Sequence, residues 1–327
     1  MKVTIIIPNY NGKHFLAPCL DSLSKQSCPD FKVLIVDNAS TDGSLEYLQE
    51  NYPDIEVISL KENIGFSGAV NAGIKAADTP YVILLNNDTV SDEHYVEQMI
   101  KAMESFPRYF SVSSKMIQMY RPELIDSAGD LYTVLGLGVC QGKDYPITHY
   151  NKFSSVFSAC AGAAIYRRDV FEEIGYFDES FFAYLEDMDI GYRAMIYGYQ
   201  NMYCPQAVVY HVGSGTSGSM YNTFKVKLSA RNSIWLNYKN MPLLQLIVNL
   251  LPLLAGCLIN LIFLGRLGFG KDYLSGLWDG IKGIKKHAKV KFRFSHLGNY
   301  FKIEFQLVKN AFYYAFFMLA RRFERNK

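Results

Sequence analysis

The sequence predicts an α/β fold, a parallel sheet covered by helices, followed by a helical C-terminal region. Two observations predict it. Short apolar runs alternate with amphipathic segments in the N-terminal part, which is typical of strands covered by helices. The charge balance also changes: residues 1–224 hold 15 basic and 27 acidic residues, whereas residues 225–327 hold 18 and 4. We therefore expect one large domain over 1–224 and a separate region over 225–327.

Four strands and three helices are expected first. Apolar runs predict buried strands, and helical spacing of apolar residues predicts helices around 15–23, 45–48 and 66–74. The strands are expected at Val3–Ile7, Val33–Val36, Ile55–Ile58 and Tyr81–Leu85. Ligands of such sheets bind beyond the carboxyl ends of the strands. The polar segments at these ends, which are candidate binding residues, are 8–10, 37–42 and 86–88.

The following elements are less regular. Residues 91–104 predict an amphipathic helix with Ser91 as its N-cap, and strands are expected near 110–118 and 156–160. Residues 161–182 indicate a strand, a short helix and a turn, before a helix from Glu186 to about Tyr197. Residues 208–210 predict the last strand, and a loop over 212–220 follows that is rich in Gly and Ser.

The cysteines and sequons indicate a reducing compartment. Six scattered cysteines include no CxxC pair and no zinc-ligand spacing, so we expect reduced thiols rather than disulfides. The chain starts with an apolar strand, and no signal peptide is expected. Glycosylation sequons at Asn38 and Asn87 fall inside the candidate binding segments, where a glycan would block binding. We therefore expect a cytosolic domain.

Single carboxylates stand at two of the strand ends. Asp37 either accepts hydrogen bonds from a nucleobase and ribose or serves as a turn carboxylate, and Asp42 is the expected cap of the next helix. Asp88 follows the fourth strand, where a carboxylate can hold Mg²⁺ or Mn²⁺ against a diphosphate. Such an ion would stabilise the charge that develops on a departing nucleotide.

Three further carboxylates, Glu186, Asp187 and Asp189, crowd the start of one helix. The helix dipole favours acidic residues there, but like charges so close also raise one another's pKa, which suits a general base. Asp187 is the expected base, and Glu186 beside it completes the catalytic set. His211 ends the last strand and is either a satisfied polar residue or a second ligand of the ion at Asp88.

Six segments occur in the order and spacing of one enzyme family: IIIPNYNG, VDNASTDGS, NIGFSGAVNAGI, LLNNDT, GYFDESFFAYLEDMDIGYR and YHVGS. Between about Val3 and Asn232 the sequence thereby resembles the family-two inverting glycosyltransferases. The resemblance implies the GT-A fold, a Rossmann-like mixed sheet flanked by helices. Within that family the pattern looks most like bacterial rhamnosyltransferases of cell-surface polysaccharide synthesis. The pair Arg231-Asn232 supports the same resemblance.

The resemblance implies a role for each matching residue. Asp88 and His211 would bind the metal, Mg²⁺ or Mn²⁺, and Asp187 would deprotonate the acceptor hydroxyl, which attacks opposite the nucleotide and inverts the configuration. The family's Asp-x-Asp element begins with Asn86 here, which implies a weakly held ion. The nucleotide of a dTDP- or UDP-linked sugar donor would be held by Pro8, Tyr10, Asp37, Asn63, Gly65, Asn71 and Asn87.

The C-terminal region is both apolar and basic. Residues 240–265 are 26 uncharged residues, whereas residues 266–302 carry nine basic and two acidic residues, which resist export across a membrane. We expect a hairpin broken near Pro252 or helices that lie in the interface, with a membrane surface rather than nucleic acid as partner. Phe305–Leu319, followed by Arg321, Arg322 and Arg325, predicts a second interfacial helix or a helix that covers the catalytic core.

These features predict a catalytic domain over 1–224 and a membrane-associating region over 225–327. The expected enzyme is an inverting, metal-dependent glycosyltransferase at the cytoplasmic face of the cell membrane, peripheral or monotopic. It would move one sugar, with rhamnose suggested by the resemblance, to a lipid-linked saccharide. We expect no nucleic-acid partner, because basic arms that bind nucleic acid are rarely flanked by 26 uncharged, mostly apolar residues.

Three alternative functions are weighed. A nucleotidyltransferase needs a Gly-rich phosphate loop after the first strand, which residues 8–12 do not provide. A processive polysaccharide synthase is expected to have several membrane spans and a Gln-x-x-Arg-Trp element, which are missing. A non-catalytic, membrane-bound nucleotide-sugar-binding protein has no need of Asp37, Asp88 and Asp187 together.

Overall fold

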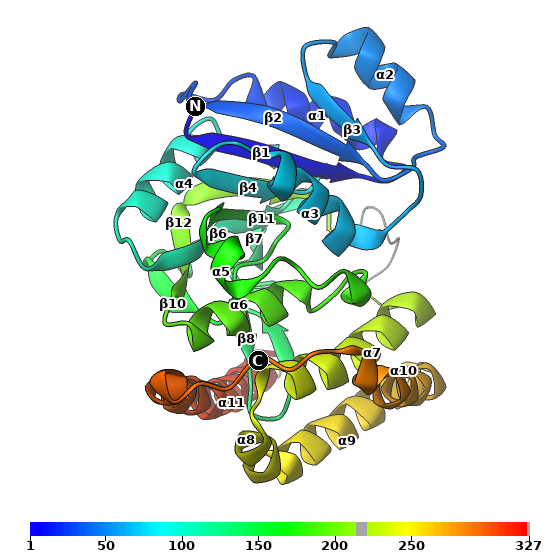
Figure 1. Cartoon of the computed structure of the whole chain (residues 1–327), viewed down its shortest axis with the longest axis vertical. Coiled ribbons are helices and arrows are strands. Elements are labelled where there is room, and N and C mark those ends of the chain that lie inside the picture. The colour runs from blue at the N-terminus through cyan, green and yellow to red at the C-terminus, as the bar shows by residue number, and fades with distance from the viewer. Residues whose placement is uncertain (214–220, 326–327) are drawn as a thin grey trace. The chain divides into compact units, whose positions relative to one another are not determined.

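The computed structural model describes residues 1–213 and 221–325, and these residues form two compact units (Figure 1). The first unit comprises Met1–Asp130, Cys140–Ala194 and the described part of Tyr199–Met220. The second comprises Leu131–Val139, Met195–Gly198 and the described part of Tyr221–Lys327. The long C-terminal stretch of the second unit thus begins at Tyr221, and two short inner segments join it. All six cysteines are free, as expected.

A ten-stranded mixed sheet forms the first unit. Its main path is β10-β12-β6-β11-β4-β1-β2-β3, with β5 paired to β12 and β7 paired to β6. The first four strands are mutually parallel, and helices make the crossovers that parallel pairing requires. β11 runs antiparallel to both of its neighbours, β4 and β6. The sheet is therefore mixed, as the resemblance to the GT-A fold implies, and its parallel part includes the four strands that the alternation of strands and helices predicts.

The N-terminal elements confirm the predicted order. The strands are β1 (Val3–Asn9), β2 (Phe31–Asp37), β3 (Glu56–Ser59) and β4 (Tyr81–Leu85). The helices are α1 (Lys13–Leu23), α2 (Ser44–Asn51) and α3 (Gly65–Ala76). The aliphatic side chains of β1, of the second half of β2 and of β4 are buried, and apolar side chains of α1 and the later helix α4 join the same core. This core holds the carboxyl ends of β1, β2 and β4 in fixed positions.

The helix predicted over 91–104 starts later than expected. α4 spans Tyr95–Glu104, and Ser91 is the last residue of the short strand β5 (Thr89–Ser91). β5 pairs with β12, and the backbone N–H of Ser91 donates to Ser22 Oγ at 3.0 Å. The N-cap role of Ser91 is therefore wrong, because the strand pairing uses residues that the helical spacing assigned to the helix.

The strands predicted near 110–118, 156–160 and 208–210 are present with changed lengths, and three further strands between residues 121 and 140 were not predicted. β6 (Tyr109–Gln118) and β7 (Arg121–Ser127) precede β10 (Ser154–Val156), which is shorter and earlier than predicted. β8 (Asp130–Tyr132) pairs with β9 (Gly138–Cys140) outside the main sheet. The strand, short helix and turn of 161–182 are β11 (Ala163–Arg167), α5 (Val170–Ile174) and η1 (Glu179–Phe181), followed by α6 (Glu186–Ile196). β12 (Gln200–His211) exceeds the predicted 208–210 because it pairs with β6 from end to end.

The second unit contains mostly helices. They are α7 (Thr223–Asn240), α8 (Leu243–Val248), α9 (Leu250–Arg266), α10 (Gly270–Gly283), η2 (Ile284–Lys286), η3 (Phe294–His296) and α11 (Leu297–Arg325). The apolar stretch breaks at Asn249, close to the predicted Pro252, which lies in the first turn of α9. Among the described residues, no helix combines the length and apolarity needed to cross a bilayer.

Two predicted features lie wholly or partly outside the described residues. Of the Gly- and Ser-rich loop over 212–220, only the first two residues are described. The side chains of Arg321, Arg322 and Arg325 are also outside the described part, although the backbone of α11 continues to residue 325.

Candidate active site

Polar side chains at the carboxyl ends of β1, β2 and β4 form one hydrogen-bonded cluster. Asn9 Nδ2 donates to Asp37 Oδ1 at 2.9 Å, and Asn87 Nδ2 donates to Asn9 Oδ1 at 2.7 Å. The other oxygen of Asp37 accepts the backbone N–H of Ser40 at 2.9 Å, and Asp37 is fully buried. Asp37 thus stabilises its own turn, and the nucleotide roles of Asp37 and Asn87 stay predictions. Asn9 lies within the candidate binding segment 8–10, although no role of its own was predicted for it.

Pro8 and Tyr10 lie at the same edge of the sheet. Pro8 belongs to β1 and is partly buried, whereas Tyr10 follows the strand and is 38% exposed. A phenol ring in this position can stack on a flat ligand. Gly12 follows closely, and a Cβ there would lie only 2.1 Å from Asn87 Nδ2. The backbone after β1 therefore passes directly over the cluster of polar side chains.

Polar side chains in and just before α3 form hydrogen bonds with other groups of the protein. Asn63 Oδ1 accepts the backbone N–H of Gly65 at 2.9 Å. Gly65 has a φ of +78°, and a Cβ there would lie 2.5 Å from the carbonyl oxygen of Phe182, so only glycine fits. The amide of Asn71 binds Phe177 twice, donating to its carbonyl at 2.8 Å and accepting its N–H at 3.1 Å. These contacts fasten the segment before α6 to α3, and a nucleotide role for Asn63, Gly65 and Asn71 stays a prediction.

Asp42 holds the starts of two helices. Its Oδ1 accepts the N–H of Ser44, the first residue of α2, at 3.1 Å, which confirms the predicted cap. Its Oδ2 accepts the N–H of Lys13, the first residue of α1, at 2.9 Å. Burial opposes the ionised form, but the hydrogen bonds from Ser44 and Lys13 hold the pKa of Asp42 below its usual range.

Asp88 and His211 face each other, and a second carboxylate stands behind the histidine. His211 Nε2 lies 3.3 Å from Asp88 Oδ1, and His211 Nδ1 lies 2.7 Å from Asp126 Oδ2. Lys143 contacts the other oxygen of Asp126. Burial disfavours the charged imidazole, but its hydrogen bonds to the two carboxylates outweigh burial and raise the pKa of His211 to about 9.

This arrangement fits a divalent metal. A metal-binding histidine usually donates its second ring N–H to a carboxylate, and Asp126 accepts from Nδ1 in that way. Once His211 loses its other proton, Nε2 and the Asp88 carboxylate offer one nitrogen and one oxygen ligand at the same point. Asp126 was not predicted from the sequence, because it lies near the end of β7 and belongs to no motif. Strand pairing of β6 with both β7 and β12 brings it to His211.

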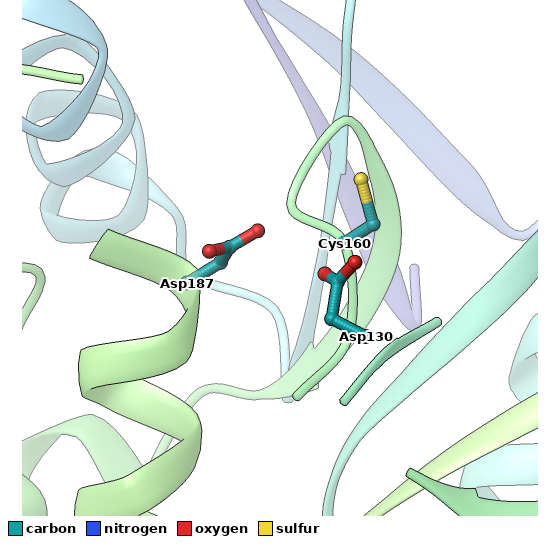
Figure 2. Close-up of side chains that lie close together, drawn as sticks. All are labelled: Asp130, Cys160 and Asp187. Atoms are coloured by element: carbon teal, nitrogen blue, oxygen red, sulfur yellow. The ribbon is translucent and has the colours of Figure 1, made fainter. Parts of the chain in front are cut away.

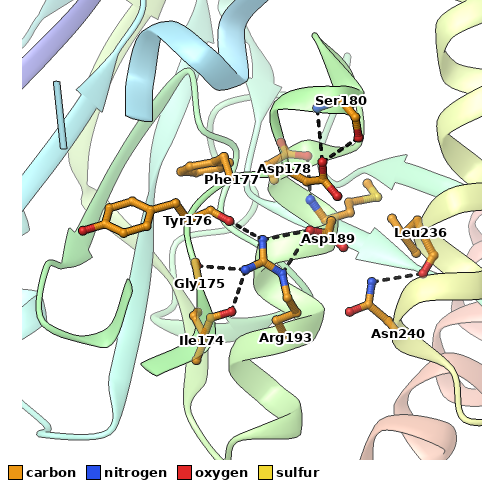
Figure 3. Close-up of polar contacts among 12 residues, drawn as sticks. Ile174, Gly175, Tyr176, Phe177, Asp178, Ser180, Asp189, Arg193, Leu236 and Asn240 are labelled. Carbon is orange, nitrogen blue, oxygen red and sulfur yellow. Dashed lines mark hydrogen bonds and ion pairs between the residues drawn. The ribbon is translucent and has the colours of Figure 1, made fainter. Parts of the chain in front are cut away.

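The three carboxylates at the start of α6 have different surroundings. Asp189 is fully buried and accepts two hydrogen bonds from Arg193, from Nε at 3.0 Å and Nη2 at 2.8 Å (Figure 3). Arg193 also donates to the carbonyls of Ile174, Gly175 and Tyr176. Asp189 therefore anchors the segment before α6 through a buried ion pair and takes no part in an open site.

Asp187 lies beside Asp130 and Cys160 instead. Ligand atoms of these three residues lie within 4.8 Å of one another (Figure 2). Burial raises the pKa of Asp187 to about 6. Burial, and then the charge of Asp187, raises the pKa of Glu186 to about 8, and Glu186 Oε2 has no hydrogen-bond partner among the described residues. The predicted rise in pKa is confirmed, but burial rather than mutual repulsion is its first cause.

Asp130 was likewise not predicted from the sequence. It begins β8, is 6% exposed, and its backbone N–H donates to Ser158 at 3.0 Å. Burial, and then the charges of Asp187 and Glu186, raises the pKa of Asp130 well above its usual range. Burial also raises the pKa of Cys160 well above that of a free thiol, and a protonated thiol is a poor metal ligand. The pair of Asp88 and His211 therefore suits a metal better than the group around Asp187.

Comparison with known proteins decides the family. Residues 4–175 match the model of Glycosyl transferase family 2, which is more than half of the chain. The chain belongs to glycosyl transferase family 2. The predicted resemblance is thereby confirmed.

Curated relatives of this family-two glycosyltransferase share low identity with it. An N-acetylglucosaminyl-diphospho-decaprenol L-rhamnosyltransferase of Mycobacterium tuberculosis is 26% identical over 65% of this chain and 77% of its own length. A poly-β-1,6-N-acetyl-D-glucosamine synthase of Staphylococcus epidermidis is 21% identical over 67% of this chain. The chain spans only 52% of the length of that synthase.

Solved structures establish the fold of this family-two glycosyltransferase. A mannosyltransferase from Pyrobaculum calidifontis, in complex with GDP-Man and Mn²⁺, superposes with a TM-score of 0.54 and 16% identity, covering 87% of each chain. At this identity the likeness shows the fold alone. It confirms the predicted GT-A-type α/β fold.

Proposed function

We propose that this family-two glycosyltransferase moves one sugar, with inversion, from a nucleotide-sugar donor to a hydroxyl group of a lipid-linked saccharide in cell-surface polysaccharide synthesis. The observation that carries the proposal is the pair of chemically distinct groups in the first unit. One is the Asp88–His211 pair with Asp126 behind it. The other is Asp187, a carboxylate whose pKa is raised to about 6 by burial.

The proposed reaction is a single displacement. Asp187 is ionised at neutral pH yet more basic than an exposed carboxylate, which is the property a general base needs. It takes the proton of the acceptor hydroxyl while the acceptor oxygen forms a bond to the anomeric carbon. The bond from that carbon to the diphosphate breaks, and its electron pair leaves with the nucleotide. When bound at Asp88 and His211, Mg²⁺ or Mn²⁺ supplies positive charge that stabilises the leaving diphosphate.

The proposed donor is a dTDP- or UDP-linked sugar, with rhamnose as the sugar. The support is the Mycobacterium tuberculosis relative, whose name gives L-rhamnose and a decaprenol-linked acceptor. The residues proposed to hold the nucleotide lie around the ends of β1, β2 and β4 and the start of α3. They are Pro8, Tyr10, Asp37, Asn63, Gly65, Asn71 and Asn87.

We also propose that the enzyme works at the cytoplasmic face of the cell membrane as a peripheral or monotopic protein. Residues 225–327 hold 18 basic and only 4 acidic residues, a balance that favours an anionic lipid surface. A lipid-linked acceptor would be presented at such a surface. The second unit, which contains these residues, is the proposed attachment region.

Nucleotide release tests the proposed reaction. The purified protein, in detergent with membrane lipid extract, would be given dTDP-, UDP- and GDP-sugars with Mn²⁺ or Mg²⁺, and then with EDTA. We expect release from one donor, abolished by EDTA and by Asp187→Asn, but retained in the control Asp54→Asn, which changes an exposed carboxylate.

The products separate the competing readings. Mass spectrometry should find acceptor extended by one sugar, whereas a ladder of products would indicate a processive synthase. Failure of any nucleotide to bind would contradict the glycosyltransferase reading. Release that is unchanged in Asp187→Asn would remove Asp187 from the role of base.

A further inference from the structure

Helices α8 and α9 expose their apolar side chains and bury their polar ones. Gln245 and Asn249 are 9% and 1% exposed, and both donate to Glu304 Oε2 of α11, at 2.6 and 2.9 Å. Eleven large apolar side chains of the same helices are 47–77% exposed. These residues, the α8–α9 apolar face, are Leu243, Leu244, Ile247, Val248, Leu250, Leu251, Leu254, Leu258, Ile259, Ile262 and Phe263.

The exposed positions of α9 share one side of the helix. Leu251, Leu254, Leu258 and Ile262 follow the three- and four-residue spacing of a helical face. The opposite side is closely packed, since a Cβ on Gly256 would lie 1.8 Å from the carbonyl oxygen of Leu135. This helix therefore cannot rotate to bury its apolar side chains without losing that contact.

The helices α10 and α11 repeat this pattern. Phe301, Phe305, Phe312 and Phe316 lie on one side of α11 and are 68–74% exposed. On α10, Leu274, Trp278 and Ile281 lie on one side and are 50–57% exposed. Soluble proteins expose single apolar residues freely, but exposed apolar stripes on several helices mark a surface that meets a partner.

The charge and the length of these helices together indicate which partner this surface binds. No described helix has the length and apolarity to cross a bilayer, so these helices are suited to lie in its plane. Exposed lysines accompany the apolar stripes, among them Lys282, Lys285 and Lys291, and they suit anionic headgroups. The polar groups of Gln245 and Asn249 are bonded inward, so they add no cost of desolvation on entry into lipid.

We propose that the α8–α9 apolar face enters one leaflet of an anionic bilayer, with the exposed side of α10 and its Trp278 at the level of the headgroups. This attachment deepens the membrane location in the proposed function, and it requires no transferase activity. It therefore holds or fails separately from the reaction.

Vesicle flotation of the full chain tests the proposal. The protein would be mixed with vesicles of phosphatidylcholine alone or with added phosphatidylglycerol, without donor or acceptor. We expect flotation with the anionic vesicles. The bound fraction should be at least about tenfold lower for the double variant Leu251→Gln/Leu258→Gln, since this variant replaces two leucines that would otherwise be buried in the lipid. Tyr120→Gln is the matched control, because Tyr120 is 77% exposed on the first unit. Lys285→Glu/Lys291→Glu should weaken only the binding to anionic vesicles.

Tryptophan fluorescence gives a second readout of depth. The chain has two tryptophans, of which Trp235 is 7% exposed and Trp278 is 57% exposed. Brominated lipids should quench Trp278, and Trp278→Phe should remove most of the quenching. Wild-type protein that does not float, or a Gln variant that floats equally well, would overturn the proposal. So would a lipid-free dimer that the Gln variant converts to monomer, because the face would then bind a second copy.

Discussion

The neighbouring carboxylates Asp187 and Asp189 should respond to the same substitution in opposite ways. Asp189 is fully buried and paired with Arg193, which is itself only 4% exposed. Asp189→Asn would leave the guanidinium buried without a counter-charge. Removing one partner of a buried ion pair costs about 3–5 kcal/mol. We expect the lower end of this range, about 3 kcal/mol, because Asn can still accept one hydrogen bond and Arg193 keeps three carbonyl acceptors.

Urea unfolding followed by circular dichroism measures this loss. With a slope of about 3 kcal/mol per molar urea, a loss of about 3 kcal/mol lowers the midpoint by about 1 M. Asp187→Asn is the matched control at two residues' distance. Burial raises the pKa of Asp187 to about 6, so its charge is a cost to the folded state, and Asn should leave the midpoint unchanged or slightly higher.

The activity of the same two variants completes the test. Asp187→Asn should stay folded and lose nucleotide release, whereas Asp189→Asn should lose stability first. Equal midpoints for the two variants, or an unchanged midpoint for Asp189→Asn, would refute the assignment of Asp189 to structure and Asp187 to chemistry.

Three further predictions concern single positions. The pKa of Glu186 is raised from 4.5 to about 8, so the stability that the protonated carboxyl contributes is lost as pH rises from 4.5 to 8. Glu186→Gln should therefore be more stable than wild type at pH 8. Equal stabilities at pH 8 would contradict this. Asp126→Asn should weaken Mn²⁺ binding, measured by calorimetry, by about ten- to hundredfold, because His211 loses the carboxylate that orients its ring. Unchanged binding would mean that the metal binds elsewhere. Gly65→Ala should lower the melting temperature, since the added Cβ would meet Phe182 at 2.5 Å and φ is +78°; an unchanged melting temperature would mean that the turn can relax.

The sequence by itself determined the order of the strands and helices from β1 to β4, whereas it did not predict β5, β7, β8 and β9. The elements from β1 to β4 have regular apolar spacing, and the apolar period is a local property of the chain. The six motifs determined the family as well, and a match over residues 4–175 confirms it. Ser91 shows the limit of this reasoning, because its pairing in β5 depends on β12, which lies far along the chain.

Only the tertiary structure decided which of the carboxylates at the start of α6 is structural and which is available for chemistry. Spacing places Glu186, Asp187 and Asp189 in one helical turn, but their neighbours come from other elements. Asp130 lies beside Asp187, and Asp126 lies beside His211, 85 residues away in sequence. No local pattern indicates such contacts, because strand pairing creates them.

In the C-terminal helices, too, the sequence determines one property and the tertiary structure another. Their composition alone predicts an apolar, basic region. Which side of α8 and α9 is buried is decided by Glu304, which lies 55 residues beyond Asn249 and accepts its hydrogen bond. A buried amide requires a partner, and where that partner lies fixes the rotation of the helix. The apolar side chains are then left exposed, a result that the amino-acid pattern of α8 and α9 does not contain.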